Sequence, residues 1–164
     1  MSDSASTTNV VETKGSSAGS LTATDSSAAP RYSDAVIAYT ILRLSFGANI
    51  MLHGISRLLA GRAAFLGYLN HYFEKTPLIP ASFLPIFATV LPPVEATLGL
   101  LLLVGLATRF SLIAGGFVMA ALVVGTNLAQ DWNVAGLQLI YCLLYYHLLV
   151  RRRELNRLSI DAWR

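Results

Sequence analysis

The feature that most constrains this sequence is the segment 41–57, which is apolar enough to cross a bilayer although it carries two arginines and a histidine. A charged group at membrane depth costs about 3 kcal/mol or more, so such groups normally face the interior of a bundle or a wet cavity. On a helix that advances about 100° per residue, four polar side chains of this region fall on about one third of the circumference: Arg43, Asn49, His53 and Arg57. The segment therefore predicts a helical membrane bundle in which other helices cover a polar stripe.

The composition is that of a membrane protein. Of the 164 residues, 54% are apolar and 13% are charged, and the mean hydropathy is +0.56. The net charge of +3 lacks the broad basic surface with aromatic residues that nucleic-acid binding needs, so no nucleic-acid partner is expected. Cys142 is the only cysteine, which excludes an intrachain disulfide and a Cys-x-x-Cys pair. With Glu95 as the only acid inside a predicted span, no metal site is expected either.

The apolar runs predict an all-α integral membrane four-helix bundle with an amphipathic interfacial helix between spans 1 and 2. A bilayer core of about 30 Å needs about 20 apolar residues in a helix, and four runs of this chain are long enough. The membrane domain is predicted at 34–150, with spans at about 35–59, 83–106, 109–129 and 134–150 and the interfacial helix at about 62–75.

The two ends of the chain are predicted to be polar tails on one side of the membrane. Residues 1–33 are rich in Ser, Thr and Ala without apolar periodicity, which is typical of a disordered tail. Residues 151–164 form a basic tail. Because most lysines and arginines lie on the side of the termini, the positive-inside rule places both termini in the cytoplasm. The membrane is expected to be the plasma (inner) membrane of a prokaryote.

Glu95 is the residue whose chemistry the sequence leaves most open. Counted at about 1.5 Å per residue, its depth lies between those of Arg43 and His53, so an ion pair with Arg43 and a hydrogen bond with His53 are both within reach. One interpretation is a structural lock between the first two spans. The other is a ligand or proton site, since ionisable groups inside a membrane are functional candidates. Glu95 and His53 are then the candidate catalytic groups.

The fourth span offers polar groups that can face the stripe. Gln138 and Tyr141 lie on one side of this helix, although tyrosines near a membrane boundary are also typical of an aromatic belt. The full set of candidate ligand-binding residues is Arg43, Asn49, His53, Arg57, Glu95, Gln138 and Tyr141.

Several short motifs between about residues 38 and 150 resemble the DoxX family of small four-helix membrane proteins. They are Arg43, the His53-Gly54-x-x-Arg57 motif, a proline-preceded Glu95 and the Thr108-Arg109 turn. The resemblance implies a subunit of a quinone-linked oxidoreductase system, such as one that oxidises sulfur compounds, with a redox-enzyme partner or larger membrane complex. It implies a quinone as the cofactor, and no covalently bound cofactor is expected. Arg57 and His53 would then receive a quinone head group or an anion, and Glu95 would take the proton released when quinol is oxidised.

Two further functions stay open beside this one. The chain is alternatively a non-catalytic membrane anchor or assembly subunit, in which the polar stripe acts only on stability. The third hypothesis is a small anion transporter, which the two arginines on one stripe, Arg43 and Arg57, suggest. Because the four spans contain no inverted repeat, this hypothesis requires that the protein form a homo-oligomer. The residues do not decide whether the chain is an enzyme.

Overall fold

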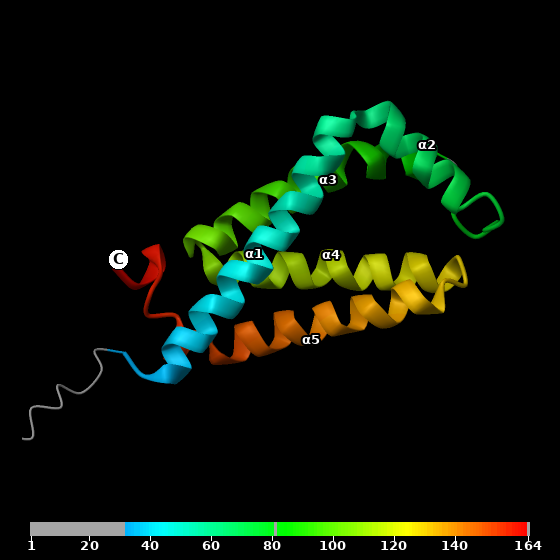
Figure 1. Ribbon diagram of the computed structural model, residues 1–164. Helices are drawn as coiled ribbons and strands as arrows, with labels where there is room; N and C mark the ends of the chain where they lie inside the picture. The colour runs from blue at the N-terminus through cyan, green and yellow to red at the C-terminus, as the bar shows by residue number, and fades with distance from the viewer. Residues whose placement is uncertain (1–31, 81, 164) are drawn as a thin grey trace, which may run out of the picture. The chain divides into compact units, whose positions relative to one another are not determined.

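The computed structural model describes residues 32–80 and 82–163. This part of the chain contains α-helices and one short 3-10 helix and no strand, and its elements are α1 (Asp34–Ala60), α2 (Arg62–Tyr72), α3 (Phe83–Val104), α4 (Thr108–Leu128), α5 (Trp132–Leu155) and η1 (Ile160–Trp163) (Figure 1). Four helices, α1, α3, α4 and α5, are long and apolar enough to cross a membrane. The predicted all-helical membrane bundle is confirmed.

The helix ends follow local chemistry. Gly61 separates α1 from α2 with a positive φ of 86°, and Gly105 ends α3 in the left-handed region at φ 71°. Asp131 caps α5, because its carboxylate accepts a hydrogen bond from the Val134 N–H at 3.1 Å. These ends give bounds close to the predicted ranges, except that α5 continues past residue 150 to Leu155.

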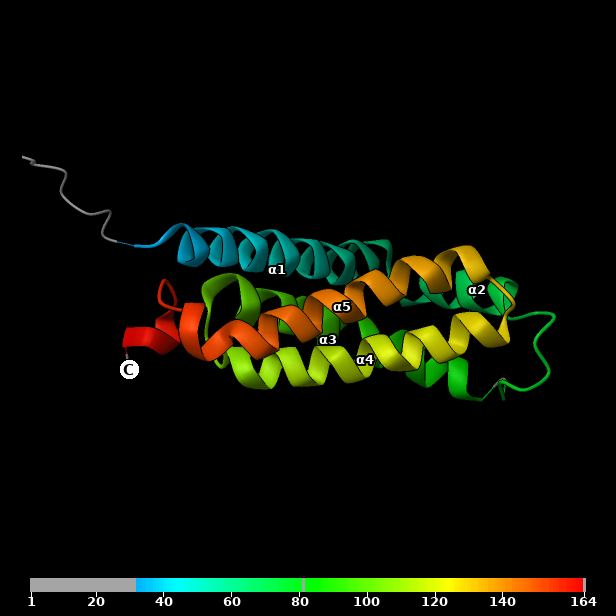
Figure 2. The same ribbon diagram turned by 90° about the horizontal axis from the view of Figure 1, so that it is seen from below.

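The long helices pack most closely as the pairs α1 with α3 and α4 with α5, as the two views together show (Figures 1 and 2). The contact between α1 and α3 depends on glycines. A Cβ added at Gly54 would lie 2.3 Å from the Ala96 nitrogen, and one at Gly99 would lie 2.2 Å from the Met51 nitrogen. Only glycine permits this approach, which sets the register of the two antiparallel helices.

Two apolar clusters hold the bundle together. The larger joins the four long helices through buried side chains that include Phe46, Leu102, Leu112 and Leu148. The smaller packs α2 against the first half of α3, with Phe65 of α2 among its buried members. Helix α2 thereby lies over the end of the bundle away from Tyr32, which we call the outer end (Figure 2).

The segment predicted as a basic tail, 151–164, is folded over its described part, because α5 continues to Leu155 and η1 follows. After α5 the chain turns back, and the Asp161 carboxylate accepts hydrogen bonds from the N–H groups of Ala107 and Thr108 at 2.8 and 2.7 Å. No side chain close in sequence caps α4, so its first N–H groups need a distant acceptor. Residues 1–31 of the predicted N-terminal tail lie outside the described residues.

Candidate functional site

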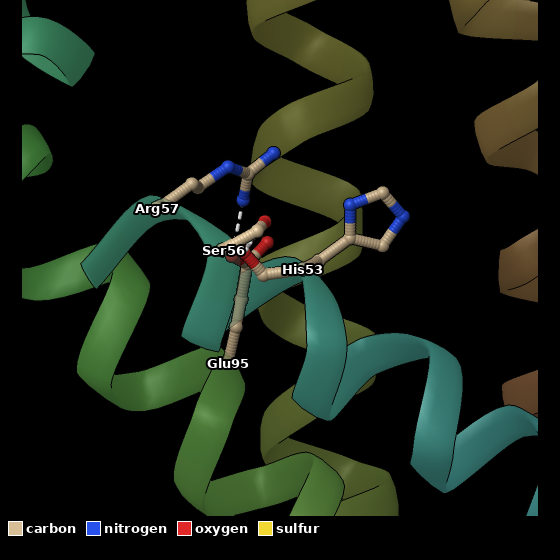
Figure 3. A network of polar contacts seen from close by, with 4 residues as sticks. All are labelled: His53, Ser56, Arg57 and Glu95. Atoms are coloured by element: carbon tan, nitrogen blue, oxygen red, sulfur yellow. Dashed lines mark hydrogen bonds and ion pairs between the residues drawn. The ribbon is translucent and has the colours of Figure 1, made fainter. Parts of the chain in front are cut away.

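The central polar contact of the outer end is an ion pair between α1 and α3. Arg57 donates from Nη1 to Oε2 of Glu95, whose side chain is 9% exposed against 28% for Arg57. Figure 3 shows Glu95 pointing from α3 toward the guanidinium near the end of α1. A carboxylate this deeply buried needs such a partner, because an unpaired charge in a dry environment is costly.

Neither of the two partners predicted for Glu95 is correct. The prediction compared depths along straight helices, whereas the register is set by the glycine contacts. Gly54 lies against Ala96, the residue after Glu95, so the carboxylate is level with the last turns of α1. From there Arg57 is the cation within reach, and Arg43 is about four turns away.

His53 lies beside this pair in the sequence but does not take part in it. Its side chain points away from Glu95 in Figure 3, and the residue is exposed. The nearby Ser56 hydroxyl donates to the backbone oxygen of His53 at 3.0 Å, not to the ring. The expectation that helices cover the whole polar stripe is therefore wrong at His53, which lies on the side of α1 away from α3.

Arg43 is enclosed by backbone. It is 2% exposed, and its guanidinium donates to the oxygens of Leu102 and Leu103 at the end of α3 and of Leu158 beyond α5. The last carbonyls of a helix lack partners within the helix and carry partial negative charge, so a guanidinium is a suitable cap for them. These contacts fit the interpretation of a structural lock, made here with carbonyls in place of Glu95.

The remaining predicted residues bind to each other or to neighbours. Asn49 donates from Nδ2 to the Tyr141 hydroxyl at 3.0 Å, which joins α1 to α5. Gln138 lies further toward the outer end, where its Oε1 accepts from the Thr126 hydroxyl at 2.8 Å. Of these two polar residues on the fourth span, Tyr141 bonds to α1 and Gln138 bonds to α4.

A cavity of about 200 Å³ lies beside Arg57 at the outer end. Helices α2 and α3 supply one side of its lining and α4 and α5 the other, and Gln138 is among the lining residues. Its aromatic lining residues are Phe65, Tyr68, Tyr72, Phe73, Phe83 and Phe87. Sequence reasoning missed this set, because the aromatic residues of 65–73 were interpreted only as the apolar face of an interfacial helix.

Two contacts order the rim of the cavity. The Arg57 guanidinium lies 5.0 Å from the centre of the Phe65 ring, a cation–π distance. The Tyr72 hydroxyl donates to Asp131 at 2.9 Å and so ties α2 to the turn between α4 and α5. Burial, and next this hydrogen bond, raise the pKa of the Tyr72 hydroxyl, which therefore stays protonated at ordinary pH.

The cavity offers donors more than acceptors. Arg57 has only N–H groups to offer, and the Gln138 amide adds the two donors of its NH2 group. A ligand that suits this site is flat, largely apolar and rich in hydrogen-bond acceptors.

Fold and site together define a small helical membrane protein with an ion pair in the bundle and an aromatic cavity at its outer end. Comparison with protein families gives the particular family. The chain belongs to the family described as methylamine utilisation protein MauE, whose model matches residues 35–138. No curated protein and no solved structure matches the chain.

The match corrects the assignment to the DoxX family, which is wrong. The motifs behind that assignment are short, and the structure gives several of them a packing role. Gly54 permits the contact with α3, and Arg43 caps the end of α3. Such features meet general needs of a small helical bundle, so they do not separate one membrane family from another.

Proposed function

We propose that this chain is a membrane component of an amine-oxidation system. The observation that carries the proposal is the match to a family described by methylamine utilisation, over a range that contains Arg57, Glu95 and the whole lining of the cavity. A membrane subunit of an oxidation system, with an enzyme as partner, is retained from the sequence analysis. Oxidation of sulfur compounds is not, because it rested on the DoxX assignment alone.

We further propose that the cavity beside Arg57 binds a quinone head group. A volume of about 200 Å³ is below the ~300 Å³ at which pockets for drug-sized ligands begin, so it suits a single ring. A quinone ring is flat, stacks on aromatic side chains and accepts hydrogen bonds at both carbonyl oxygens. The donors of Arg57 and Gln138 and the aromatic walls are complementary to these properties.

In this arrangement Glu95 has a positioning role. Its carboxylate holds the Arg57 guanidinium at the edge of the cavity, where the remaining N–H groups can meet a carbonyl oxygen of the ligand. Interconversion of quinone and quinol moves two electrons and two protons. We propose that the partner redox enzyme exchanges the electrons, that Glu95 exchanges one proton, and that water exchanges the other. His53 is left outside this proposal, because its ring points away from the ion pair.

The same proposal includes an orientation in the inner membrane of a prokaryote. The end of the bundle with the C-terminal arginines carries more positive charge than the outer end with Arg62 and Lys75. By the positive-inside rule the arginine-rich end is cytoplasmic, and the cavity then opens toward the other side of the membrane.

The test is to purify the tagged full-length protein from its native membrane in mild detergent, measure quinone in the lipid extract and identify bound enzymes by mass spectrometry. We expect quinone in fixed proportion to the wild-type protein and its loss in Arg57→Gln. Arg62→Gln is the matched control: it removes a cation at the same end, but Arg62 donates to the Thr89 hydroxyl and does not line the cavity. Equal quinone in both variants, or none in the wild type, would contradict quinone binding.

Co-purification of a redox enzyme without quinone would favour the alternative of an anchor or assembly subunit. The transporter alternative has less support, since both arginines of the predicted anion path are engaged. Arg43 binds carbonyl oxygens and Arg57 binds Glu95. Anion flux into proteoliposomes that Arg57→Gln abolishes would reverse this ranking.

A further inference from the structure

The folded C-terminal segment builds a second, basic hollow at the end of the bundle opposite the cavity. It has a volume of about 590 Å³ and is lined by the guanidinium-bearing residues Arg152, Arg153 and Arg157 and by the aromatic residues Tyr32 and Trp163. Figure 2 shows the C-terminal turn and the start of α1 at this same end. The hollow exists because Asp161 holds η1 against the start of α4.

Positive charge exceeds negative charge in this hollow, because three arginines line it against the single carboxylate of Asp161. No ion pair within the described residues involves Arg152, Arg153 or Arg157. The Asp161 carboxylate offsets one of these charges, and both of its oxygens are held by the backbone N–H groups of Ala107 and Thr108. Glu154 pairs with Arg151. The hollow therefore favours an anionic ligand.

Two observations indicate that this ligand carries acyl chains. Tyr146, Val150 and Arg153 are exposed and lie four and then three residues apart, so they share one side of α5. This stripe runs from the apolar surface of Tyr146 and Val150 to Arg153, which lines the hollow. Trp163 is 83% exposed and Tyr32 is 39% exposed, and tryptophan and tyrosine are enriched where a membrane meets water.

From this juxtaposition we infer that the hollow is a binding site for the head group of an anionic phospholipid. The phosphate lies among the guanidinium groups of Arg152, Arg153 and Arg157, and the acyl chains run along the stripe of Tyr146 and Val150. The site lies outside residues 35–138, the range of the family match, and is separate from the cavity at Arg57.

The test is a titration of the purified full-length protein with phosphatidylglycerol or phosphatidylcholine in mild detergent, followed by native mass spectrometry. We expect a clear preference for phosphatidylglycerol. A basic residue near a lipid surface contributes roughly a fivefold gain in affinity, so the double variant Arg152→Gln/Arg157→Gln should bind phosphatidylglycerol about thirtyfold more weakly. Its binding of phosphatidylcholine should not change.

The matched control is Arg109→Gln/Arg151→Gln, which removes the same charge at the same end from residues outside the hollow. We expect it to lower the affinity less than about twofold, as expected for screened charges at a distance. An equal loss in both double variants would overturn the site in favour of diffuse attraction. Displacement of the lipid by millimolar inorganic phosphate would overturn the lipid as its ligand.

A second measurement leaves the arginines unchanged and so does not depend on how those variants fold. In a Trp132→Phe background, Trp163 is the only tryptophan, and its fluorescence is recorded in vesicles that contain brominated lipid. At equal mole fraction, brominated phosphatidylglycerol should quench Trp163 more than brominated phosphatidylcholine. Equal quenching by the two lipids would contradict enrichment of the anionic lipid at the hollow.

Discussion

Arg43 and Arg57 lie on the same helix and on nearly the same side of it, but their surroundings differ. Arg43 is 2% exposed and donates to backbone oxygens of two other segments. Arg57 is partly exposed, binds a carboxylate and lines a cavity. A guanidinium surrounded by carbonyls has little left to offer a ligand, whereas one at a cavity edge keeps N–H groups available. Two arginines on the same side of one helix therefore have different roles: Arg43 stabilises packing at one end, and Arg57 is available for binding at the other.

The largest effect is expected from removing the donors of Arg43. Arg43→Met keeps much of the apolar stem but leaves the buried carbonyl oxygen of Leu102 and the partly buried ones of Leu103 and Leu158 without their partner. Each buried unsatisfied group costs about 1–3 kcal/mol, so the free energy of unfolding should fall by about 3 kcal/mol or more. The measurement is unfolding of the purified protein by denaturing detergent, followed by circular dichroism.

Arg43→Lys is the control for this prediction, since an ammonium group restores donors without the planar fork. It should recover part of the lost stability. If Arg43→Met unfolds at the wild-type detergent concentration, the carbonyl contacts do not hold this end of the bundle, and the contrast with Arg57 disappears.

The next largest effect is expected from Gly54→Ala, which tests how Arg57 obtains its partner. The new Cβ would lie 2.3 Å from the Ala96 nitrogen and 2.5 Å from the Pro92 oxygen, so α1 and α3 must separate. Overpacking of this kind costs about 1–3 kcal/mol in unfolding free energy. Gly136→Ala is the matched control on α5, where no heavy atom lies within 4 Å of the added Cβ, and it should leave stability unchanged or slightly higher.

A smaller effect is expected at the ion pair itself. Glu95→Gln should lower the free energy of unfolding by about 1 kcal/mol, because the partly exposed Arg57 can turn to solvent. A double-mutant cycle with Arg57→Gln measures the pairing directly. The effects of the two single changes should sum to more than the effect of the double change, since both remove the same contact. Additive effects would show that the two side chains do not interact.

The smallest effect is expected from Tyr72→Phe, which opens the tie between α2 and Asp131 without touching either arginine. Loss of one hydrogen bond should cost about 1 kcal/mol or less. Tyr68→Phe is the control, since no hydrogen bond of the Tyr68 hydroxyl is found in the described part of the chain, and it should change stability less. In both variants, hydrogen-exchange protection of the backbone around Arg43 should be the same as in the wild type.

The raised pKa of Tyr72 adds a pH dependence to this prediction. The unfolded chain loses the Tyr72 proton near pH 10, whereas the folded protein holds it to higher pH. The wild type should therefore lose stability as the pH rises above about 10, because the unfolded state then binds fewer protons. Tyr72→Phe should lose less stability over the same range.

Hydropathy and helix length were sufficient to predict the fold, because a bilayer allows few ways to satisfy the backbone of a long apolar segment. They were not sufficient for the partner of Glu95. That partner depends on the lateral register of α1 and α3, which Gly54 and Gly99 set by contact. The sequence shows that these residues are glycines, but it does not show which helix each glycine contacts.

The fold of the C-terminal segment was not predicted, for a related reason. Its arginines dominate the composition and predict a basic tail, while its structure depends on Asp161 and the bonds of that carboxylate to the start of α4. A signal was present in α4, which begins without a local side-chain cap and so needs an acceptor from elsewhere. The sequence does not tell that this acceptor lies 53 residues further along the chain.

The contact between Arg43 and Leu158 also has a consequence for the synthesis of the protein. Arg43 enters the membrane with the first span, but the Leu158 oxygen that it binds is made 115 residues later. At about 5–20 residues per second, the ribosome needs on the order of ten seconds to cover that distance. During this interval the buried guanidinium lacks one of its acceptors. The first helix therefore reaches its final set of contacts only after residue 158 has been translated.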